Sequence, residues 1–397
     1  MAKIERTHFW TGTLNAAVVP QLQGRRTGLY DTTLRDGEQA VGVVLEPEQK
    51  LDLARQLNGL GVDRIEAGFP RVSGDDRQAI ELILSAGLKA EIWGFSRALA
   101  EDVRAVIDLG LRSTVIEAPI SDLKLDALKL SREAVLRRVT ESVQLAAEQG
   151  VRVAFFGVDG SRADPAFFDQ IYTAAVAAGA AEVVVVDTIG IATPELVSWM
   201  VQRTVALVGP KIPVHFHGHN DFGLATACAI AAVVAGASWI HGTVDGMGER
   251  AGNASLAEVA LALEGLYGVE TNLNLSRIRT VSEQLRRFAG YRLEPWKPVV
   301  GDNLFVRETG AVAAQFHIPQ AIEPYSAAIL ETPRRVVLGK KSGVASIRIK
   351  CEELGLAVAE ERGSEVLANV KALAIGKRGL VTDAEFRQIV LSTAGRV

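Results

Sequence analysis

Hydrophobic and polar positions follow two alternating patterns along most of this chain. Short apolar or β-branched runs with a period of two are separated by longer segments whose apolar positions recur about every 3.6 residues. The short runs predict strands over residues 28–33, 64–68, 91–95, 113–118, 151–156, 182–187, 213–219 and 239–244. The longer segments predict helices over residues 47–60, 75–86, 101–109, 132–149, 165–178, 194–208, 223–235 and 255–267.

The ends of the predicted helices carry the residues that helix termini favour. Pro47, Pro165 and Pro194 stand at first helical positions, and several helices are followed directly by glycine, as at Gly61 and Gly150. A run of eight strand–helix units implies an α/β protein with a (β/α)8 TIM barrel. In such a barrel the active site lies at the carboxyl ends of the strands, so residues distant in sequence are expected to meet at one mouth.

The eight units place the catalytic barrel at residues 28–270, and the segments outside it predict three further parts. Residues 1–27 are expected to form an N-terminal arm, because they have no sustained period. Residues 271–344 form a linker and dimerisation region, with helices over 275–291 and 303–316, a rigid turn at 294–298 and a strand or loop at 334–343. Residues 345–397 form a small C-terminal subdomain of two or three short amphipathic helices.

Composition narrows the class of partner. The net charge is −4 and charges of both signs are scattered, which excludes a basic stripe for nucleic acid and a polybasic patch for membranes. Cys228 and Cys351 are the only cysteines, so a disulfide framework is not expected. Together with an N-terminus that has no apolar signal-peptide core, this predicts a cytoplasmic protein that acts on small molecules.

Two charged residues follow the first predicted strand, in the stretch TGLYDTTLRDGEQ from Thr27 to Gln39. Gly37 breaks the strand pattern, which leaves Arg35 and Asp36 at the carboxyl end of that strand. The alternative interpretation is a solvated ion pair in a surface turn.

Three histidines alternate in the stretch HFHGHNDFG, at the end of the seventh predicted strand. Alternation places His217 and His219 on one face, where two imidazoles and a carboxylate such as Asp36 can bind one divalent ion. The alternative is a hydrogen-bonded pair of core histidines. His215, which has the same parity, is expected to be a satisfied histidine deeper in the barrel.

With these motifs in place, the chain resembles the metal-dependent barrel enzymes that condense acetyl-CoA with 2-oxo acids: homocitrate, isopropylmalate and citramalate synthases. The matching motifs are DTTLRDGEQ, IEAGFP, VDTIGIATP, HGHNDFGLATA, GMGERAGNASL and LGKKSG, in this order from residue 31 to 343. The length and the short helical tail are most similar to the homocitrate synthases.

The resemblance implies a set of roles at the mouth. Asp36, His217 and His219 would bind a divalent ion such as zinc, manganese, cobalt or magnesium, with Asn253 as a further ligand or as a neighbour of the ligands. The 2-oxo acid would chelate this ion, and Arg35 would stabilise the alkoxide that forms when the acetyl carbanion attacks the keto carbon.

Other residues of the mouth are given supporting roles by the same resemblance. Thr188 would bind the substrate carboxylate, and Gln39 would line the same mouth. Glu66 has either a direct catalytic role or a purely structural one, as a carboxylate satisfied by an arginine. The glycine-rich stretch GMGERAGN could bind phosphate or could be only a turn before the eighth helix.

The chain departs from the family at two proton-handling positions in the linker. Family members carry a histidine and a tyrosine there, where this chain has Val312 and Ile322. His317 and Tyr325 lie close by in sequence, and each is either a substitute or an ordinary structural residue.

The predicted substrate pocket departs as well. On the fifth strand the family pattern Ser-x-Glu-Asp is replaced by Phe156, Gly157, Val158 and Asp159, which removes two polar groups from one side. On the other side, candidate substrate-binding residues are Arg97, Ser121, Lys124 and Arg162. A positive rim without internal partners favours a 2-oxo acid with a second acidic group, although an exposed lysine is commonly just solvated.

These observations predict an acyltransferase that condenses acetyl-CoA with a 2-oxo acid to a 2-substituted malate and works as a homodimer. Two alternatives remain. One is a metal-dependent aldolase or acyl-CoA lyase on the same barrel, and the other is a non-catalytic relative, which the loss of the two proton-handling residues would explain.

Overall fold

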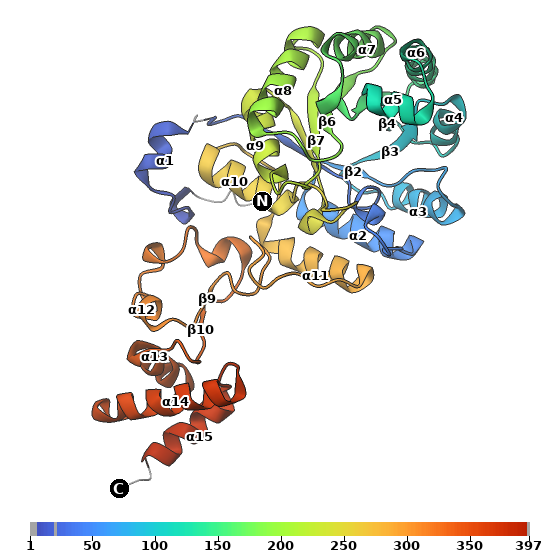
Figure 1. The fold of residues 1–397 in the computed structure, drawn as a ribbon. Helices are drawn as coiled ribbons and strands as arrows, with labels where there is room; N and C mark the ends of the chain where they lie inside the picture. Colours follow the sequence, from blue (N-terminus) through green and yellow to red (C-terminus); the bar gives the residue numbers. More distant parts are fainter. Residues whose placement is uncertain (1–5, 20–21, 395–397) are drawn as a thin grey trace. The chain divides into compact units, whose positions relative to one another are not determined.

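Eight parallel strands close into a barrel in which each strand pairs with the next and β8 pairs with β1 (Figure 1). This computed structural model describes residues 6–19 and 22–394. The strands are β1 (Gly28–Asp31), β2 (Arg64–Glu66), β3 (Glu91–Arg97), β4 (Ser113–Pro119), β5 (Arg152–Val158), β6 (Glu182–Asp187), β7 (Val214–Gly218) and β8 (Trp239–Gly242). The predicted (β/α)8 barrel is therefore confirmed.

Helices surround the barrel and connect its strands (Figure 1). They are α2 (Pro47–Leu60), α3 (Gly74–Ser85), α4 (Ala100–Asp108), α5 (Asp122–Leu128), α6 (Arg132–Glu148), α7 (Pro165–Ala177), α8 (Pro194–Val208), α9 (Ala225–Ala235), α10 (Leu256–Ala262) and α11 (Ile278–Ala289). Short turns of helix add η2 (Gly37–Gln39), η3 (Gly160–Arg162), η4 (Val244–Gly246), η5 (Leu263–Tyr267) and η6 (Leu275–Arg277). Two helices were not predicted: α1 (Gly12–Val18) in the arm, and α5 after β4.

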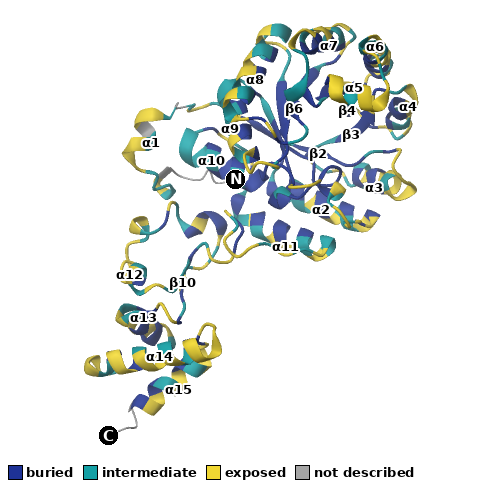
Figure 2. Cartoon of the chain, in the orientation of Figure 1, coloured by how far each residue is buried: buried dark blue, intermediate teal, exposed yellow. Residues whose placement is uncertain are grey.

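The barrel interior is filled by side chains of alternate strand residues, and the strands are the most buried part of this unit (Figure 2). One buried cluster joins inward side chains from five strands: Tyr30, Trp93, Phe95, Val115, Ala154, Phe156, Val184 and Val186. This packed layer closes the barrel beneath the mouth. Polar side chains with the same parity, further along each strand, therefore project into the mouth.

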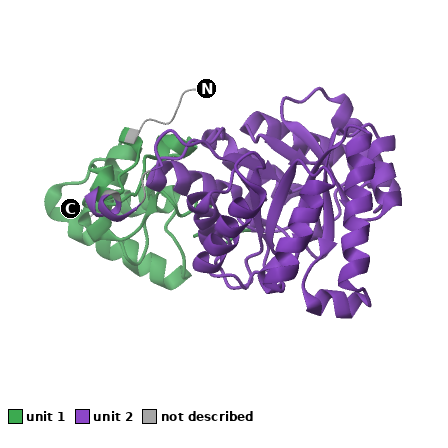
Figure 3. Ribbon diagram, turned by 90° about the horizontal axis from the view of Figure 1, so that it is seen from above, with its two compact units in different colours: residues 1–12, 293–397 green, residues 13–292 purple. Residues whose placement is uncertain are grey.

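The chain divides into two compact units, residues 13–292 and residues 1–12 with 293–397 (Figure 3). In the described part of the second unit lie β9 (Val306–Arg307), β10 (Arg335–Val336), α12 (Gly310–Ala313), α13 (Val344–Leu354), α14 (Gly363–Lys377) and α15 (Asp383–Ala394). Its shorter turns are η1 (Arg6–His8), η7 (Pro319–Ala321), η8 (Ala327–Leu330) and η9 (Glu360–Arg362). The three helices of the tail pack around Leu338, Val366 and Phe386, which are buried.

The helix predicted over residues 303–316 is wrong in extent, because only α12 (Gly310–Ala313) is helical there and β9 (Val306–Arg307) is a strand. The backbone there pairs with a distant segment, because Arg335 N donates to Phe305 O at 3.0 Å and Val337 N donates to Arg307 O at 2.9 Å. Gly310 then lies so close to Gly343 that a Cβ on Gly310 would stand 2.5 Å from the Gly343 Cα. This tertiary pairing overrides the local helical pattern.

Among the described helices, none is long and apolar enough to cross a membrane.

Candidate active site

The turn after β1 holds Arg35 and Asp36 in a fixed place. The carbonyl oxygen of Thr32 accepts hydrogen bonds from the amides of Arg35, Asp36 and Gly37, at 3.2, 2.9 and 3.0 Å. The hydroxyl of Thr33 accepts from Val244 N at 2.9 Å, which ties the turn to the end of β8. Both charged side chains are consequently buried at the mouth, and the interpretation as a solvated surface pair is wrong.

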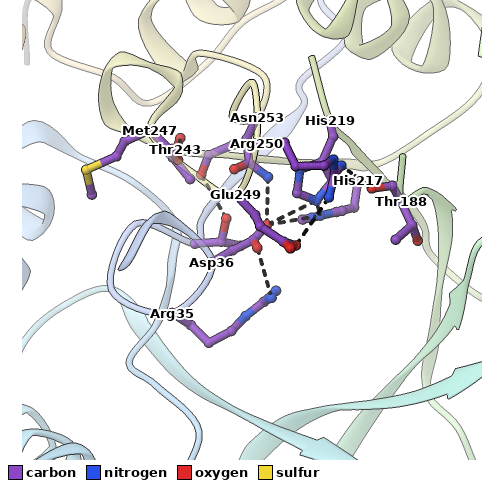
Figure 4. A network of polar contacts seen from close by, with 12 residues as sticks. Arg35, Asp36, Thr188, His217, His219, Thr243, Met247, Glu249, Arg250 and Asn253 are labelled. Carbon is purple, nitrogen blue, oxygen red and sulfur yellow. Dashed lines mark hydrogen bonds and ion pairs between the residues drawn. The ribbon is translucent and has the colours of Figure 1, made fainter. Parts of the chain in front are cut away.

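The imidazoles of His217 and His219, at the end of β7, turn toward Asp36 (Figure 4). The Nε2 atoms of His217 and His219 lie 3.2 and 3.7 Å from Asp36 Oδ2, and 3.4 Å from each other. All three side chains are buried. The predicted trio is therefore one cluster of three donor atoms.

Asn253 completes this cluster from the loop after β8. Its Nδ2 donates to Asp36 Oδ2 at 2.6 Å, and its Oδ1 is buried without a hydrogen-bond partner within the described chain. Gly248 makes room for this amide, because a Cβ there would stand 1.9 Å from Asn253 Oδ1. Gly248 thus serves the approach of Asn253, whereas Gly252 lets the chain pass close to the backbone of Gly246.

The donor set fits a divalent metal ion. Ligand atoms 3.2 to 3.7 Å apart are compatible with one ion at about 2.1 Å from each. Burial, followed by the neighbouring His217, lowers the pKa of His219 to about 4, so this imidazole is neutral at physiological pH, as a metal ligand must be. Asn253 turns its Nδ2 toward Asp36 and its Oδ1 toward Gly248, so it lies beside the three donor atoms and adds no fourth one.

Arg35 presents a free donor to the same space. Its Nε donates to Glu66 Oε2 at 2.6 Å, its NH1 lies 3.3 Å from Asp36, and its guanidinium stacks 4.1 Å over the Phe95 ring. Burial alone would lower the pKa of Arg35, but the carboxylates of Glu66 and Asp36 more than compensate and raise it. The remaining NH2 group is buried without a hydrogen-bond partner among the described residues.

Glu66 is fully buried and satisfied within the protein. It accepts from Arg35 Nε and from the Tyr30 hydroxyl, the latter at 3.3 Å. Burial raises the pKa of Glu66, and the charge of Arg35 opposes this shift. The geometry therefore makes Glu66 the group that orients Arg35.

Thr188, Ser121 and Arg162 meet around a buried carboxylate, Asp159. Thr188 Oγ1 accepts from Asp159 N at 2.7 Å, and Ser121 donates to Asp159 Oδ2 at 2.5 Å. Arg162 binds the same carboxylate through Nε and NH2, at 2.9 and 2.7 Å. The Thr188 hydroxyl donates to no residue that the structure describes, whereas Ser121 and Arg162 are engaged with Asp159 (Figure 4 shows Thr188 beside the histidines).

The prediction of a positive rim whose cations have no partners within the chain is also wrong. Asp102, which is fully buried, binds Arg97 through two hydrogen bonds of 2.7 and 3.1 Å, and Arg162 is paired with Asp159. Of the three basic residues in this predicted rim, Lys124 alone makes no ion pair within residues 6–19 and 22–394. Gln39 is exposed at the end of η2.

The remaining histidines of the barrel form a polar layer below the metal cluster. His215 Nδ1 lies 3.0 Å from His241 Nε2, and His215 Nε2 contacts Glu182. Glu182 also accepts from Arg64 through two hydrogen bonds. The prediction that His215 is a satisfied buried histidine is confirmed.

The two suggested linker substitutes differ in their surroundings. Tyr325 packs edge-on against Phe305, with ring centroids 6.0 Å apart, and burial raises its pKa to about 12. Its backbone pairs with Phe9. Tyr325 is therefore a structural residue of its own unit, whereas His317 is exposed.

Sequence reasoning missed Glu117, the acidic residue of β4. It has the parity of Val115, a member of the buried inner cluster, which places its side chain inside the barrel at the mouth. Desolvation raises the pKa of Glu117 to about 7, opposed in part by Arg35 and Arg97. The parity of the fourth predicted strand was the signal that could have revealed it.

Comparison with known proteins identifies the family. The family model described as HMGL-like matches residues 26–285. A homocitrate synthase from Methanopyrus kandleri is 41% identical over 364 residues, covering 91% of this chain and 91% of that protein. A putative (R)-citramalate synthase from Archaeoglobus fulgidus is 42% identical over 366 residues, covering 91% and 74% of the two chains.

Two further matches complete the comparison. A 2-isopropylmalate synthase from Sulfolobus acidocaldarius is 38% identical over 379 residues, covering 94% of this chain and 97% of that protein. Among solved structures, the HMG-CoA lyase from Brucella melitensis superposes with a TM-score of 0.60 at 20% identity, covering 68% of this chain and 100% of the lyase, a likeness of fold. The chain therefore belongs to the HMGL-like family, in the branch that contains the citramalate, homocitrate and isopropylmalate synthases.

Proposed function

We propose that this chain condenses the acetyl group of acetyl-CoA with the keto carbon of a 2-oxo acid, giving a 2-substituted malate and free CoA. The observation that carries the proposal is the juxtaposition of a buried Asp36–His217–His219 cluster with the unpaired NH2 of Arg35. The relatives, which are named as synthases, support an enzyme of the transferase class.

Asp36, His217 and His219 would hold a divalent ion, and Asn253 would hold Asp36 in place beside it. A 2-oxo acid would chelate such an ion through its keto and carboxylate oxygens, which would polarise the keto group. The hydroxyl of Thr188 is free to donate to the substrate carboxylate, and Arg35 NH2 is free to donate to the keto oxygen. The acid is thereby oriented with its keto carbon exposed to the acetyl group.

Arg35 then stabilises the charge that develops during carbon–carbon bond formation. As the enolate carbon of the acetyl thioester bonds to the keto carbon, the keto oxygen becomes an alkoxide, and the fixed guanidinium lies ready to donate to it. Glu66 and Phe95 hold the guanidinium from two sides, so little reorganisation is needed in the transition state. Addition of water to the thioester releases the CoA thiol and completes the reaction.

The tail of the 2-oxo acid is proposed to carry a second acidic group. With Arg97 and Arg162 neutralised internally, this proposal rests on Lys124 alone, in the first turn of α5 at the end of β4. Lys124 is half-buried as a residue, and it makes no ion pair within the described part of the chain.

Two further aspects are part of the proposal. One is a homodimer formed through the predicted linker and dimerisation region, residues 271–344. A cytoplasmic location is supported by Cys228 and Cys351, which are both free and buried.

A lyase on the same barrel is the competing function, because the fold is shared with HMG-CoA lyases. The synthase is favoured by relatives at about 40% identity over most of the chain, against 20% for the lyase.

The test is release of free thiol from acetyl-CoA with a panel of 2-oxo acids and each of the four divalent metals. We expect thiol release that requires both metal and 2-oxo acid, and fastest with an acid that carries a second acidic group. Preference for 2-oxoisovalerate or phenylpyruvate would overturn the anionic tail. No thiol release with any 2-oxo acid would overturn the condensation itself.

A further inference from the structure

Glu117 differs from every other acidic side chain that faces or borders the mouth. Those residues all have a hydrogen-bond or ion-pair partner: Asp36, Glu66, Asp102, Asp159, Asp187, Asp221, Asp245 and Glu249. The carboxylate of Glu117 makes no hydrogen bond and no ion pair with any residue that the structure describes. Its oxygens are therefore available to a ligand.

The strand register places Glu117 beside the proposed reaction centre. Glu117 pairs with Arg97 on β3 and with Phe156 on β5. The Phe156 ring packs edge-on against His217, with centroids 5.0 Å apart, and the Phe95 ring, one inward step below Arg97, carries the Arg35 guanidinium. Glu117 thus borders the two aromatic rings that support the metal cluster and the alkoxide donor.

The charges that face Glu117 from the surrounding strands and turn are Arg35, Arg97, Asp36 and Glu66. Desolvation is the largest influence and raises the pKa of Glu117 to about 7, while the two arginines lower it. A carboxylate that gains and loses its proton near neutral pH is suited to proton transfer in that range.

We propose that Glu117 is the general base that removes a proton from the acetyl methyl group of the thioester. The C–H bond breaks, its proton moves to a Glu117 carboxylate oxygen, and its electron pair forms the enolate whose oxygen takes the negative charge. The enolate carbon then bonds to the keto carbon, and the keto oxygen becomes the alkoxide beside Arg35. The proton on Glu117 returns to solvent before the next turnover.

This inference rests on the proposed condensation, and the experiment separates the two. The full-length protein is compared as wild type, Glu117→Gln, Glu117→Asp and the control Asp126→Asn, an exposed carboxylate on α5. Turnover, KM for the 2-oxo acid, metal content and the pH dependence of kcat/KM for acetyl-CoA are measured for each. Failure of the wild type to release thiol with any 2-oxo acid would contradict the condensation, and with it this inference, whereas wild-type turnover isolates Glu117.

We expect Glu117→Gln to lose about 100-fold or more in turnover, the typical contribution of a positioned base, with metal content and KM for the 2-oxo acid unchanged. The rise of the wild-type profile near pH 7 should disappear in Glu117→Gln and persist, at a lower rate, in Glu117→Asp. Asp126→Asn should match wild type.

Two results would overturn the proposal. One is a Glu117→Gln variant with wild-type turnover, and the other is a loss that follows weaker binding of the 2-oxo acid. If Glu117→Gln does not fold, the profiles of wild type and Glu117→Asp decide, and the absence of a rise near pH 7 in wild type contradicts the role.

Discussion

At the residue scale, the mouth places the buried cation Arg35 beside Asp36, His217 and His219, three donors that could hold a metal ion. Arg35 keeps its charge in a buried position because two carboxylates, Glu66 and Asp36, lie against it. The same contacts leave one guanidinium nitrogen without a partner. Burying a hydrogen-bond donor without an acceptor costs free energy. A substrate oxygen that accepts from this nitrogen would remove that cost.

Removing the Arg35 guanidinium should therefore reduce turnover more than binding. We expect Arg35→Ala to lose about 100-fold or more in turnover, as is typical when one transition-state donor is lost. Metal content should be retained, since Arg35 donates no ligand. The exposed Arg137→Ala is the matched control. Wild-type turnover in Arg35→Ala would contradict the assigned role.

The metal assignment can be tested without relying on activity alone. His217→Ala should lower the stoichiometry of bound zinc or manganese together with turnover, because it removes one of three converging donors. His317→Ala, an exposed histidine of the other unit, should leave metal content unchanged. Full metal stoichiometry in His217→Ala would show that the ion, if any, binds elsewhere.

Residue identity and spacing predicted the metal trio and the buried His215, but not the pairing of charges. Alternation along β7 is a local property and is visible in sequence. The ion-pair partners of Arg97 and Arg162 depend on the side-chain rotamers that the packed loops allow, and the sequence does not show these. The sequence alone therefore predicted an unpaired positive rim, whereas the folded chain pairs the two arginines with Asp102 and Asp159.

At the element scale, the turn that carries Arg35 and Asp36 is anchored by a buried lysine. Lys50 on α2 is 2% exposed and binds Glu38 of η2 as well as Asp76 of α3, the latter at 2.6 Å. Glu38 in turn accepts from Leu45 N at 2.8 Å. One ammonium group therefore connects the loop after β1 to two helices.

Lys50→Met should remove the ion pairs that connect the loop after β1 to the helices α2 and α3. Two carboxylates would lose their shared cation, and we expect the free energy of unfolding to fall by about 3 kcal/mol, the usual cost of removing one partner of a buried ion pair. Urea unfolding measures the change, with the exposed Lys211→Met as control. A loss no larger than that of the control would show that the contacts contribute little.

Helix boundaries in the barrel were predicted well because their signals are local. Pro47, Pro165 and Pro194 each begin a helix, as expected. The short helix α5 was missed since its seven residues cover too few turns for a period to be recognised. The segment near β9 was misassigned because pairing with β10 is not encoded locally.

At the scale of the whole molecule, the chain consists of two units with separate cores, and the proposed chemistry lies in the barrel unit. Repetition of the strand–helix unit made the barrel predictable from sequence. The second unit has no such repeat, and Val312 and Ile322 are apolar at the positions where the resemblance predicted a histidine and a tyrosine. The proposed base Glu117, which lies on the barrel itself, would perform one proton transfer that the predicted histidine and tyrosine would otherwise perform.

The most direct test of the account is the fate of the acetyl carbon. Acetyl-CoA labelled with carbon-13 at the methyl group is incubated with the enzyme, a divalent metal and the preferred 2-oxo acid, and the products are followed by NMR. The account predicts that the label appears as the methylene group of a 2-substituted malate, with one CoA thiol released for each molecule formed. Label found only in acetate, or accumulation of the label as unchanged acetyl-CoA while the enzyme cleaves hydroxy acids, would contradict it.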